Sequence, residues 1–349
     1  MAAARQRILK WAGRIALGVL ALVLVALAGG AGFEAFARQQ ARTTFKPPGR
    51  LVDIGGGRKI HVDCRGQGAP TVILESGLDS GGSLAWSKIH DRIAAGTRTC
   101  AYDRAGIMWS DPGPAPRDAE AVSDDLHATL NAIGEKAPVV LVGHSLGGPF
   151  VMSFTRKHGD QVAGVVFVDA SHPDQVARMK AAGVNYPEPP AVLKALAALT
   201  WTGWTRIPSD EGAVANMPPA AAAASKAHMA TSLPGAMKEL DSVDASFAQG
   251  GRLRSLGDRP LVVLTALKPL PAEALAQLNM TRADAGRMQA AWKALHADEA
   301  SWSSRSRHQL VPDASHYIQY DRPDVVVAAV EEVVADVRAR SAAAAPAKP

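Results

Sequence analysis

Short apolar runs recur along the chain and alternate with stretches of amphipathic spacing. The runs "TVILES" (71–76), "APVVLVG" (137–143) and "VAGVVFVDA" (162–170) are continuous, which is typical of strands buried on both faces. Before the second of these runs, residues 117–134 carry apolar side chains three and four positions apart, which predicts a helix. This alternation favours an α/β fold with a mostly parallel sheet that helices cover on both faces.

The same pattern extends over most of the chain. Residues 51–64 surround three consecutive glycines and predict a hairpin of two short strands. Further strands are predicted at "TRTCAYDR", "RPLVVLTA" and "HQLVP", which are residues 97–104, 259–266 and 308–312. Helices are predicted over residues 84–95 and 147–159, from the end of "RPLVVLTA" to about residue 300, and after Pro323.

The alternation is interrupted between residues 171 and 258. This segment contains no convincing strand, is rich in alanine, proline and methionine, and predicts helices and loops inserted between two strands. We call residues 171–258 the lid. The core domain then comprises residues 50–170 and 259–340.

An uncharged apolar segment, Ile15–Phe33, follows the N-terminal residues. It is longer than the usual apolar region of a signal peptide and falls within the range of a membrane-spanning helix, so we favour an uncleaved anchor. The alternative is a signal peptide, since Ala35-Phe36-Ala37 has the small-x-small form of a cleavage site. Residues 1–37 are therefore a signal anchor or a signal peptide, with cleavage near Ala37 in the second case.

The flanks of this segment predict which side of the membrane holds the domain. Basic residues precede the segment and stay in the cytoplasm, so the remainder of the chain is exported under either interpretation. They also supply much of the net charge of +5: Arg5, Arg7, Lys10 and Arg14. The body of the chain has no run of basic residues, so we expect no nucleic-acid partner.

Two short segments outside the core have no predicted fold. Residues 38–49 are polar, contain two prolines and predict a linker between membrane and domain. Residues 341–349 predict a disordered tail. The chain has two cysteines, Cys64 and Cys100, and an even number in an exported protein permits a disulfide. Two small buried apolar residues are the alternative interpretation.

The strand at residues 137–143 runs directly into Gly143-His144-Ser145-Leu146-Gly147. A sharp strand-to-helix turn between small residues exposes the serine hydroxyl at the carboxyl end of the sheet, which is the geometry of a nucleophile elbow. The apolar strand before the motif and the predicted helix after it support this interpretation. Ser145 is therefore the candidate nucleophile.

A serine nucleophile needs a base, and in this arrangement the acid and the histidine follow it in the chain. His316 lies between the last predicted strand and the last predicted helix, where the base belongs. His172 is a weak alternative, and we expect the side chain of His144 to pack away from the serine. No matching role is predicted for the others, which are His61, His90, His127, His158, His228, His296 and His308.

The acid is less well defined by the sequence. No carboxylate follows the strand "RPLVVLTA" before Glu273, whereas the preceding strand ends in Asp169, with Asp174 five residues later. We favour Asp169 as the acid and keep Asp174 as the alternative. Acyl transfer also needs N–H donors for an oxyanion, and the backbone N–H groups of Leu146 and Leu78 are the candidates.

Four segments in this order, "TVILESGLDSGGSLAW", "TRTCAYDRAGIMWSDPGP", "VVLVGHSLGG" with "GVVFVDASHPDQ", and "SHYIQYDRPD", resemble the α/β-hydrolase superfamily, in particular its lidded esterase-type serine hydrolases. The resemblance covers about residues 49–340 apart from the lid. It implies an eight-stranded sheet with a helical lid after the sixth strand. Some members place the acid after this strand, which fits Asp169. Many members have His-Gly where this chain has Ser76-Gly77, and glycine where it has Met108.

The resemblance also implies a pairing and a chemistry. The family's strand order places the strands of Cys64 and Cys100 side by side, so a disulfide between them is a hypothesis. A serine with a histidine suits hydrolysis of a small to medium, mostly apolar carboxylic ester, with no cofactor and no metal. We expect lid residues to line an apolar acyl pocket: Leu193, Leu196, Leu199, Trp201, Trp204, Met217 and Met229.

Two other functions remain open at this point. An aminopeptidase or amidase of the same fold would need acidic residues in the lid to hold an amine, and "SDEGA" (209–213) is the only candidate. A ligand sensor could instead retain the catalytic residues without appreciable turnover.

Overall fold

The computed structural model describes residues 2–184, 191–207 and 216–344. Its centre is one sheet of eight strands in the order β1-β2-β4-β3-β5-β6-β7-β8. Strands β1 and β2 pair antiparallel, as do β2 and β4, and every other pair is parallel. The bounds are β1 Arg50–Asp53, β2 Lys59–Arg65, β3 Val72–Glu75, β4 Thr99–Tyr102, β5 Val139–His144, β6 Val162–Val168, β7 Leu261–Ala266 and β8 Ser306–Val311.

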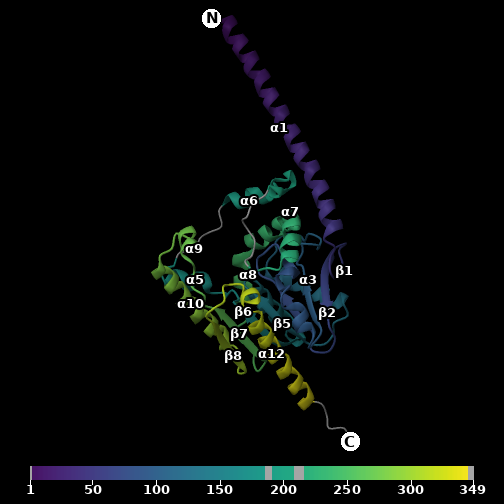
Figure 1. Ribbon diagram of the computed structural model, residues 1–349, viewed down its shortest axis with the longest axis vertical. Coiled ribbons are helices and arrows are strands. Elements are labelled where there is room, and N and C mark those ends of the chain that lie inside the picture. The colour runs from purple at the N-terminus through teal and green to yellow at the C-terminus, as the bar shows by residue number, and fades with distance from the viewer. Residues whose placement is uncertain (1, 185–190, 208–215, 345–349) are drawn as a thin grey trace.

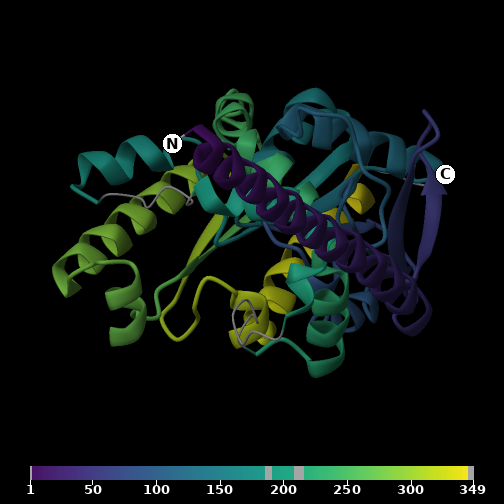
Figure 2. The same ribbon diagram turned by 90° about the horizontal axis from the view of Figure 1, so that it is seen from above.

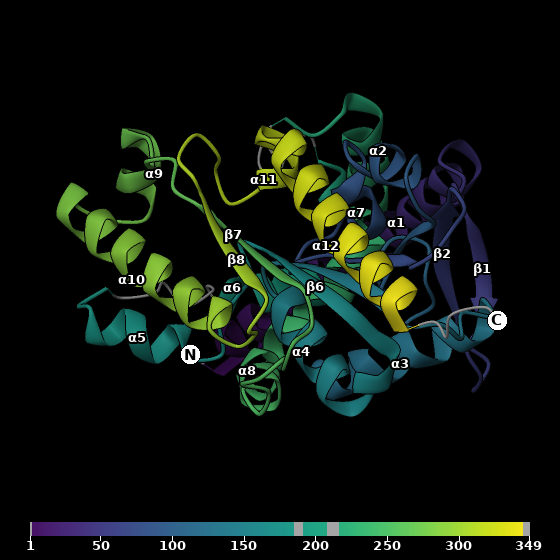
Figure 3. The ribbon, with the colours of Figure 1, turned by 90° about the horizontal axis from the view of Figure 1, so that it is seen from below.

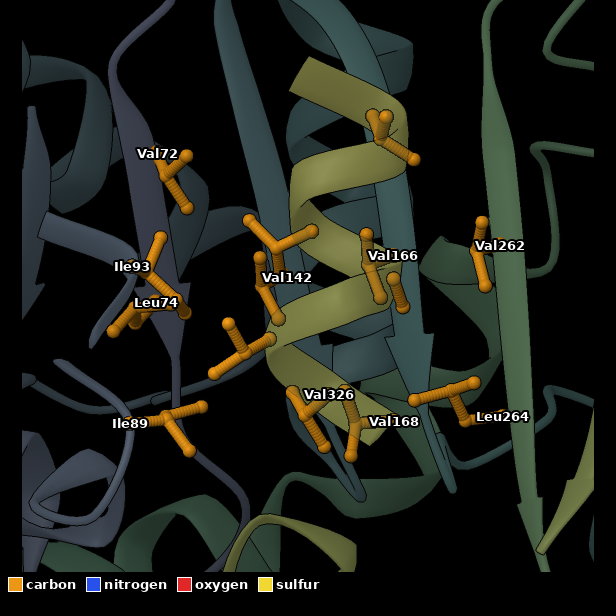
Figure 4. Packing of buried hydrophobic residues seen from close by; sticks show 14 of the residues in the cluster. Val72, Leu74, Ile89, Ile93, Val142, Val166, Val168, Val262, Leu264 and Val326 are labelled. Carbon is orange, nitrogen blue, oxygen red and sulfur yellow. The ribbon is translucent and has the colours of Figure 1, made fainter. Parts of the chain in front are cut away.

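Helices cover both faces of this sheet (Figure 3). On one face, α2 (His90–Ala94) and α12 (Pro323–Ala344) pack on the apolar side chains of the central strands. Figure 4 shows Val326 of α12 against Val142, Val166 and Val168. On the other face, α3 (Ala119–Ala132) and α4 (Gly147–Lys157) bury a second apolar cluster. The predicted α/β sheet with two covered faces is therefore confirmed.

The lid is helical in the part that the structure describes. Between β6 and β7 the chain forms α5 (Gln175–Ala181), α6 (Ala191–Ala198), α7 (Pro219–Asp241) and α8 (Val243–Gly250). Two short 3-10 turns, η3 (Thr200–Thr202) and η4 (Trp204–Arg206), connect α6 to the longer helix. A second excursion, α9 (Ala272–Gln277) and α10 (Arg282–Ala300), separates β7 from β8.

Three predicted boundaries were wrong. The helix predicted over residues 84–95 is split into η1 (Gly82–Trp86) and α2, and the last helix continues through Ala344 into the predicted tail. The first helix, α1 (Ala2–Thr44), continues through most of the predicted linker. Residues 38–44 contain only one kind of weak helix former, threonine, so the helix can continue past the point where the sequence becomes polar. The helix ends only where Pro47 approaches.

Helix α1 projects from the domain as a rod, with the N-terminus far from the sheet (Figure 1). Seen from above, it passes over the helices of the lid (Figure 2). It is the one helix in the described ranges that is long and apolar enough to cross a membrane, a test that signal sequences also pass. The final turns of α1 contact η3 and α7, so this helix is joined to the domain through the lid.

A disulfide joins the second and third strands of the sheet order. Cys64 of β2 lies directly opposite Cys100 of β4 in the antiparallel register, and their sulfur atoms are bonded. The disulfide fastens the antiparallel edge, β1-β2, to the parallel part of the sheet. The pairing implied by the resemblance is the pairing that the structure has.

Candidate active site at the carboxyl edge of the sheet

Ser145 occupies the sharp turn between β5 and α4. Its φ of 52° lies in the left-handed region, which costs a non-glycine residue backbone strain and is the sign of a nucleophile elbow. The loop after β3 comes very close to this turn, because a Cβ atom at Gly77 would lie 2.8 Å from the Cβ of Ser145. Only glycine therefore fits at position 77 without moving the loop or the serine.

Asp169 follows β6 and also has a positive φ, 45°. Its Oδ1 accepts hydrogen bonds from the backbone N–H of Ala266 at 2.8 Å and from the indole N–H of Trp292 at 3.0 Å. Its Oδ2 lies 2.7 Å from Nδ1 of His316. Burial raises the pKa of Asp169, but the hydrogen bond and charge of His316 outweigh it and hold the pKa below its usual value.

His316 lies in the loop between β8 and α11 (Ile318–Asp321). The Asp169 carboxylate accepts the Nδ1–H of His316, which leaves Nε2 as the proton acceptor of the ring. The side chain is 42% exposed, so this face of the imidazole is accessible. In the described part of the chain the Ser145 hydroxyl has no hydrogen-bond partner.

His144 contacts the loop of His316, which the sequence did not indicate. Its Nε2 lies 2.9 Å from the backbone carbonyl oxygen of His316, and the two rings are 4.7 Å apart. Burial lowers the pKa of His144 to about 3, so the ring is neutral and donates its Nε2–H to that carbonyl. The residue before the serine is thus a packing residue, as predicted, and it also holds the histidine loop.

The two candidate oxyanion donors come from the two segments that meet at the serine. Leu146 is the N-cap of α4, and Leu78 follows Gly77 in the loop after β3. Within residues 2–184, 191–207 and 216–344, neither backbone N–H is hydrogen-bonded. Both donors therefore have the free N–H that an oxyanion hole requires.

Arg104 organises the loop that carries Leu78. Its guanidinium donates to the carbonyl oxygens of Ser76 and Gly77, each at 2.7 Å. It also donates to Glu75 at 2.7 Å and to both carboxylate oxygens of Glu239 at 2.8 Å. Arg104, Glu75 and Glu239 are all buried, so one buried cation joins the loop after β3 to lid helix α7.

The alternative residues lie elsewhere. The Asp174 carboxylate accepts a hydrogen bond from Arg254 at 2.7 Å and is 41% exposed, rather than facing His316. His172 lies 2.9 Å from Asp298 instead of approaching the serine. The predicted alternatives for acid and base are therefore not part of this cluster.

A cavity of about 740 Å³ lies beside the Asp169–His316 pair. Its described walls are mainly apolar and include Met179, Leu275, Met288 and Trp292. Most of the wall comes from the α9–α10 excursion and from the loop after β7. This wall was not predicted from the sequence, because most of its apolar residues lie outside the predicted lid.

The lid residues predicted to form the pocket have other positions. None of the seven is among the described walls of this cavity, and Leu199 and Trp201 are exposed to solvent. The prediction was wrong for these two residues because η3 contacts α1 instead of the sheet edge. The side chain of Leu193 and the acidic segment 209–213 lie outside the described residues.

Comparisons with known proteins agree on the fold. A family model described as "alpha/beta hydrolase fold" matches residues 70–189. The thermophilic esterase of Thermogutta terrifontis is 20% identical, with a TM-score of 0.57 over 82% of this chain and 98% of its own. The enol-lactonase of Burkholderia xenovorans is 19% identical, with a TM-score of 0.54 over 81% of this chain and 99% of its own.

Curated relatives match only in part. The "Probable transporter efuK" of Hormonema carpetanum is 32% identical over 130 residues, which cover 35% of this chain and 18% of that protein. The chain spans less than half the length of each of the first curated relatives that it matches. The family model over residues 70–189, the order of the eight strands and the structural neighbours together show that the chain has the α/β-hydrolase fold.

Proposed function

We propose that this protein is a serine hydrolase that cleaves a small to medium, mostly apolar carboxylic ester through an acyl-enzyme intermediate. The observation that carries the proposal is the 2.7 Å contact between His316 and Asp169, beside a serine with a strained turn conformation. Burial, three hydrogen-bond donors and a lowered pKa keep the carboxylate of Asp169 ionised. A fixed anion behind one imidazole nitrogen is what a general base needs.

Each residue has one role in the proposed reaction. The Ser145 oxygen attacks the ester carbonyl while Nε2 of His316 takes the hydroxyl proton, and Asp169 stabilises the imidazolium. The same proton passes to the leaving alcohol as the carbon–oxygen bond breaks. Water, deprotonated by His316, then attacks the acyl-enzyme and releases the carboxylic acid, and the proton returns to Ser145.

The backbone of Leu78 and Leu146 would stabilise the oxyanion. The Gly77 carbonyl and the Leu78 N–H belong to one trans peptide and therefore point in opposite directions. Because Arg104 donates to the Gly77 carbonyl, the Leu78 N–H points away from Arg104. Gly77 itself lies against Ser145, which is consistent with that N–H facing the reacting carbon. Preorganised donors of this kind contribute about 3 kcal/mol each to transition-state stabilisation.

The walls of the neighbouring cavity support an apolar substrate. Just over half of the described lining residues are apolar, among them two methionines, two leucines and one tryptophan, and Lys268, Arg282 and Asp321 are charged residues of the same wall. A volume of about 740 Å³ is within the range of small-molecule sites and suits a small to medium ester. The esterase and enol-lactonase neighbours share the fold and are compatible with this chemistry.

Helix α1 serves, in this proposal, as an uncleaved membrane anchor with the domain on the exported side. Residues 4–26 are exposed along their whole length, although Ile15–Phe33 is apolar. Glu34, just before the alternative cleavage site, is buried in an ion pair with Arg206 of the lid. Cleavage near Ala37 would remove this contact, so the retained helix fits the structure better than a discarded signal peptide.

Kinetics of the full chain in detergent test the assignment. Initial rates on p-nitrophenyl esters of increasing acyl length should fall by about 10³-fold or more in Ser145→Ala, His316→Ala and Asp169→Asn. Asp174→Asn, the matched control on the other side of the same loop, should keep the wild-type rate. A collapse of Asp174→Asn with an active Asp169→Asn would refute the acid assignment.

A phosphonate probe separates the remaining possibilities. Labelling of Ser145 together with ester turnover supports the hydrolase. Labelling without ester turnover would direct attention to amide substrates, and neither labelling nor turnover by the folded protein would favour a ligand sensor.

A further inference from the structure

We infer that the lid is seated in the bilayer beside the protein's own anchor, with Leu199 and Trp201 inserted into the lipid interface. The inference rests on the membrane anchor proposed above and is independent of the chemistry at Ser145. It assigns a partner, the lipid bilayer, to an apolar surface of the lid that the catalytic proposal does not use.

One face of α1 is covered by the domain, and the pattern of cover has the period of a helix. The covered or partly covered residues recur every three or four positions, twice as adjacent pairs, and are Leu27, Gly30, Ala31, Glu34, Ala37, Arg38 and Ala41. Residues 4–26, which precede these positions in α1, are all exposed and are not covered by the domain. Contact with the domain therefore begins inside the apolar segment Ile15–Phe33, before that segment ends.

The innermost contact is backbone against backbone. A Cβ atom at Gly30 would lie 2.4 Å from the carbonyl oxygen of Thr202 in η3, so only glycine permits this approach. Gly203, the next residue of the lid, lies against Phe33. A Cβ atom at Gly203 would lie 3.2 Å from a ring carbon of Phe33. The turn between η3 and η4 is thus held at the height of Gly30 and Phe33.

Buried ion pairs fix the same arrangement one turn further along. Arg206 of η4 contacts both carboxylate oxygens of Glu34, at 2.9 and 3.0 Å, and Glu34 is 2% exposed. Arg38 contacts Glu34 at 2.8 Å and donates to the carbonyl oxygen of Ala230 in α7. The Arg206–Glu34 ion pair and the hydrogen bond from Arg38 to Ala230 each join α1 to the lid, and together they prevent the lid from sliding along α1.

The position of this contact along α1 determines how deeply the lid sits in the bilayer. A helix rises 1.5 Å per residue, so Ile15–Phe33 spans about 28 Å and matches a hydrocarbon core of about 30 Å. Gly30 then lies roughly 4–5 Å inside the end of that segment, by the same rise per residue. A turn that touches Gly30 must share that depth, which is the boundary between headgroups and acyl chains.

The lid presents the side chains that this depth requires. Leu199 is 44% exposed, Trp201 is 43% exposed and Ile207 is 69% exposed, and all three lie within or next to η3 and η4. Val192 of the neighbouring α6 is also exposed, at 57%. Tryptophan and aliphatic side chains are favoured at the membrane interface, whereas in water such a cluster would be unfavourable. Figure 1 shows α7 beside the lower part of α1, in agreement with the contacts between these two helices.

Fluorescence in nanodiscs tests the inference on the full chain. Both native cysteines are in the disulfide, so a cysteine introduced elsewhere is the only thiol available to an environment-sensitive dye. Leu199→Cys and Trp201→Cys are labelled and placed in phosphatidylcholine nanodiscs containing lipids spin-labelled near the headgroup. Val23→Cys, in the middle of the apolar segment, reports the anchor, and Leu278→Cys, 40% exposed at the end of α9, is the aqueous control.

The expected result is quenching at positions 199 and 201 several-fold stronger than at 278, with a blue-shifted emission. Weak quenching and unshifted emission at positions 199 and 201, together with blue-shifted emission at position 23, would overturn the inference about the lid. The same result would leave the membrane anchor intact. Aqueous behaviour at all four positions would overturn both. Ester turnover, measured on the same samples, reports the proposed hydrolysis separately from either result.

A second variant tests the contact itself. Gly30→Leu introduces a side chain where Thr202 now lies, and it should lift η3 and reduce quenching at position 201 several-fold. Position 23 should be unaffected. Unchanged quenching at 201 in this variant would contradict the idea that the Gly30 contact seats the lid.

Discussion

At the scale of single residues, Arg104 is the most consequential side chain outside the proposed catalytic set. A buried guanidinium loses its hydration and is tolerated only where other groups replace the lost water. Glu75 and Glu239 supply negative charge, and three oxygens of Ser76 and Gly77 accept the remaining hydrogen bonds. The ring of Phe150 lies 4.9 Å from the guanidinium carbon and covers its face.

Arg104→Met should therefore destabilise the protein and slow the reaction. The free energy of unfolding should fall by about 3–5 kcal/mol, because two buried carboxylates lose their partner. The double variant Arg104→Met/Glu239→Gln should recover part of this stability, but kcat should stay low because the Gly77 carbonyl remains unrestrained. Urea unfolding and ester kinetics measure the two effects. A double variant with wild-type kcat would contradict the role of Arg104 in positioning the loop.

Asp79, in the same loop, should make stability depend on pH. Burial raises the pKa of Asp79 to about 6, so the folded protein holds a proton that the unfolded chain has already lost above about pH 4. The free energy of unfolding should fall as pH rises from about 4 to about 6, and the loss persists at higher pH. The Asp79 contribution amounts to about 2–3 kcal/mol.

Asp79→Asn isolates this contribution. Its side-chain oxygen can still accept the N–H groups of Gly81 and Gly82, so the turn should be preserved. Relative to wild type, the variant should gain about 2–3 kcal/mol of unfolding free energy between pH 4 and pH 7, measured by denaturant unfolding. A difference that does not change with pH would refute the assignment.

Single residues differ in how far the sequence reveals them. Ser145 and His316 were predictable because glycine spacing and chain order mark them, and the position of Asp169 at a strand end narrowed the acid to two candidates. No local sequence pattern of this kind identifies the roles of His144 and Arg104. Their partners, the His316 carbonyl and Glu239, lie more than 100 positions away in the sequence, and only the folded sheet brings them together.

At the scale of elements, the antiparallel edge of the sheet depends on one covalent link. Strand β1 pairs only with β2, and β2 is joined to β4 by backbone pairing and by the Cys64–Cys100 disulfide. The disulfide closes a loop of 36 residues that contains β3 and α2. It therefore restricts the unfolded chain around the first third of the sheet.

Removing the disulfide should lower stability without touching the site. Cys64→Ala/Cys100→Ala should reduce the free energy of unfolding by about 3–4 kcal/mol in guanidinium unfolding at neutral pH. Reductant should lower the unfolding midpoint of the wild type and leave that of the double variant unchanged. Two free thiols in the denatured, unreduced wild type would show that the bond is not formed.

Element boundaries were the least predictable part of the fold. Apolar runs located the central strands, because strands buried on both faces leave a continuous apolar pattern. The more exposed edge strands β1 and β8 do not have this pattern. The extension of α1 through Thr44 was not predicted, because a polar helix surface and a polar linker have similar compositions. The side of α1 that the lid covers combines Gly30 and Ala41 with Glu34 and Arg38, which is not an apolar stripe.

At the scale of the whole molecule, helix α1, the lid and the core form a chain of contacts. Helix α1 contacts η3 and α7, α7 contacts Arg104 through Glu239, and Arg104 holds the loop beside Ser145. The sequence predicted the N-terminal segment as separate from the core, joined to it by a linker at residues 38–49, and the lid as an insert in the core. The connection between them comes from buried ion pairs, Glu34 with Arg206 and Arg104 with Glu239, whose partners no local pattern identifies.

The pairing of Arg104 with Glu239 also limits how this scaffold can be re-engineered. Inserts over an open sheet edge are attractive modules for grafting, since they are continuous in sequence and leave the strands unchanged. Here a grafted segment without an acid at the position of Glu239 would leave two buried N–H groups of the Arg104 guanidinium without the carboxylate that accepts their hydrogen bonds. A chimera would therefore have to exchange both partners together, and the exchange would reach the peptide next to Ser145.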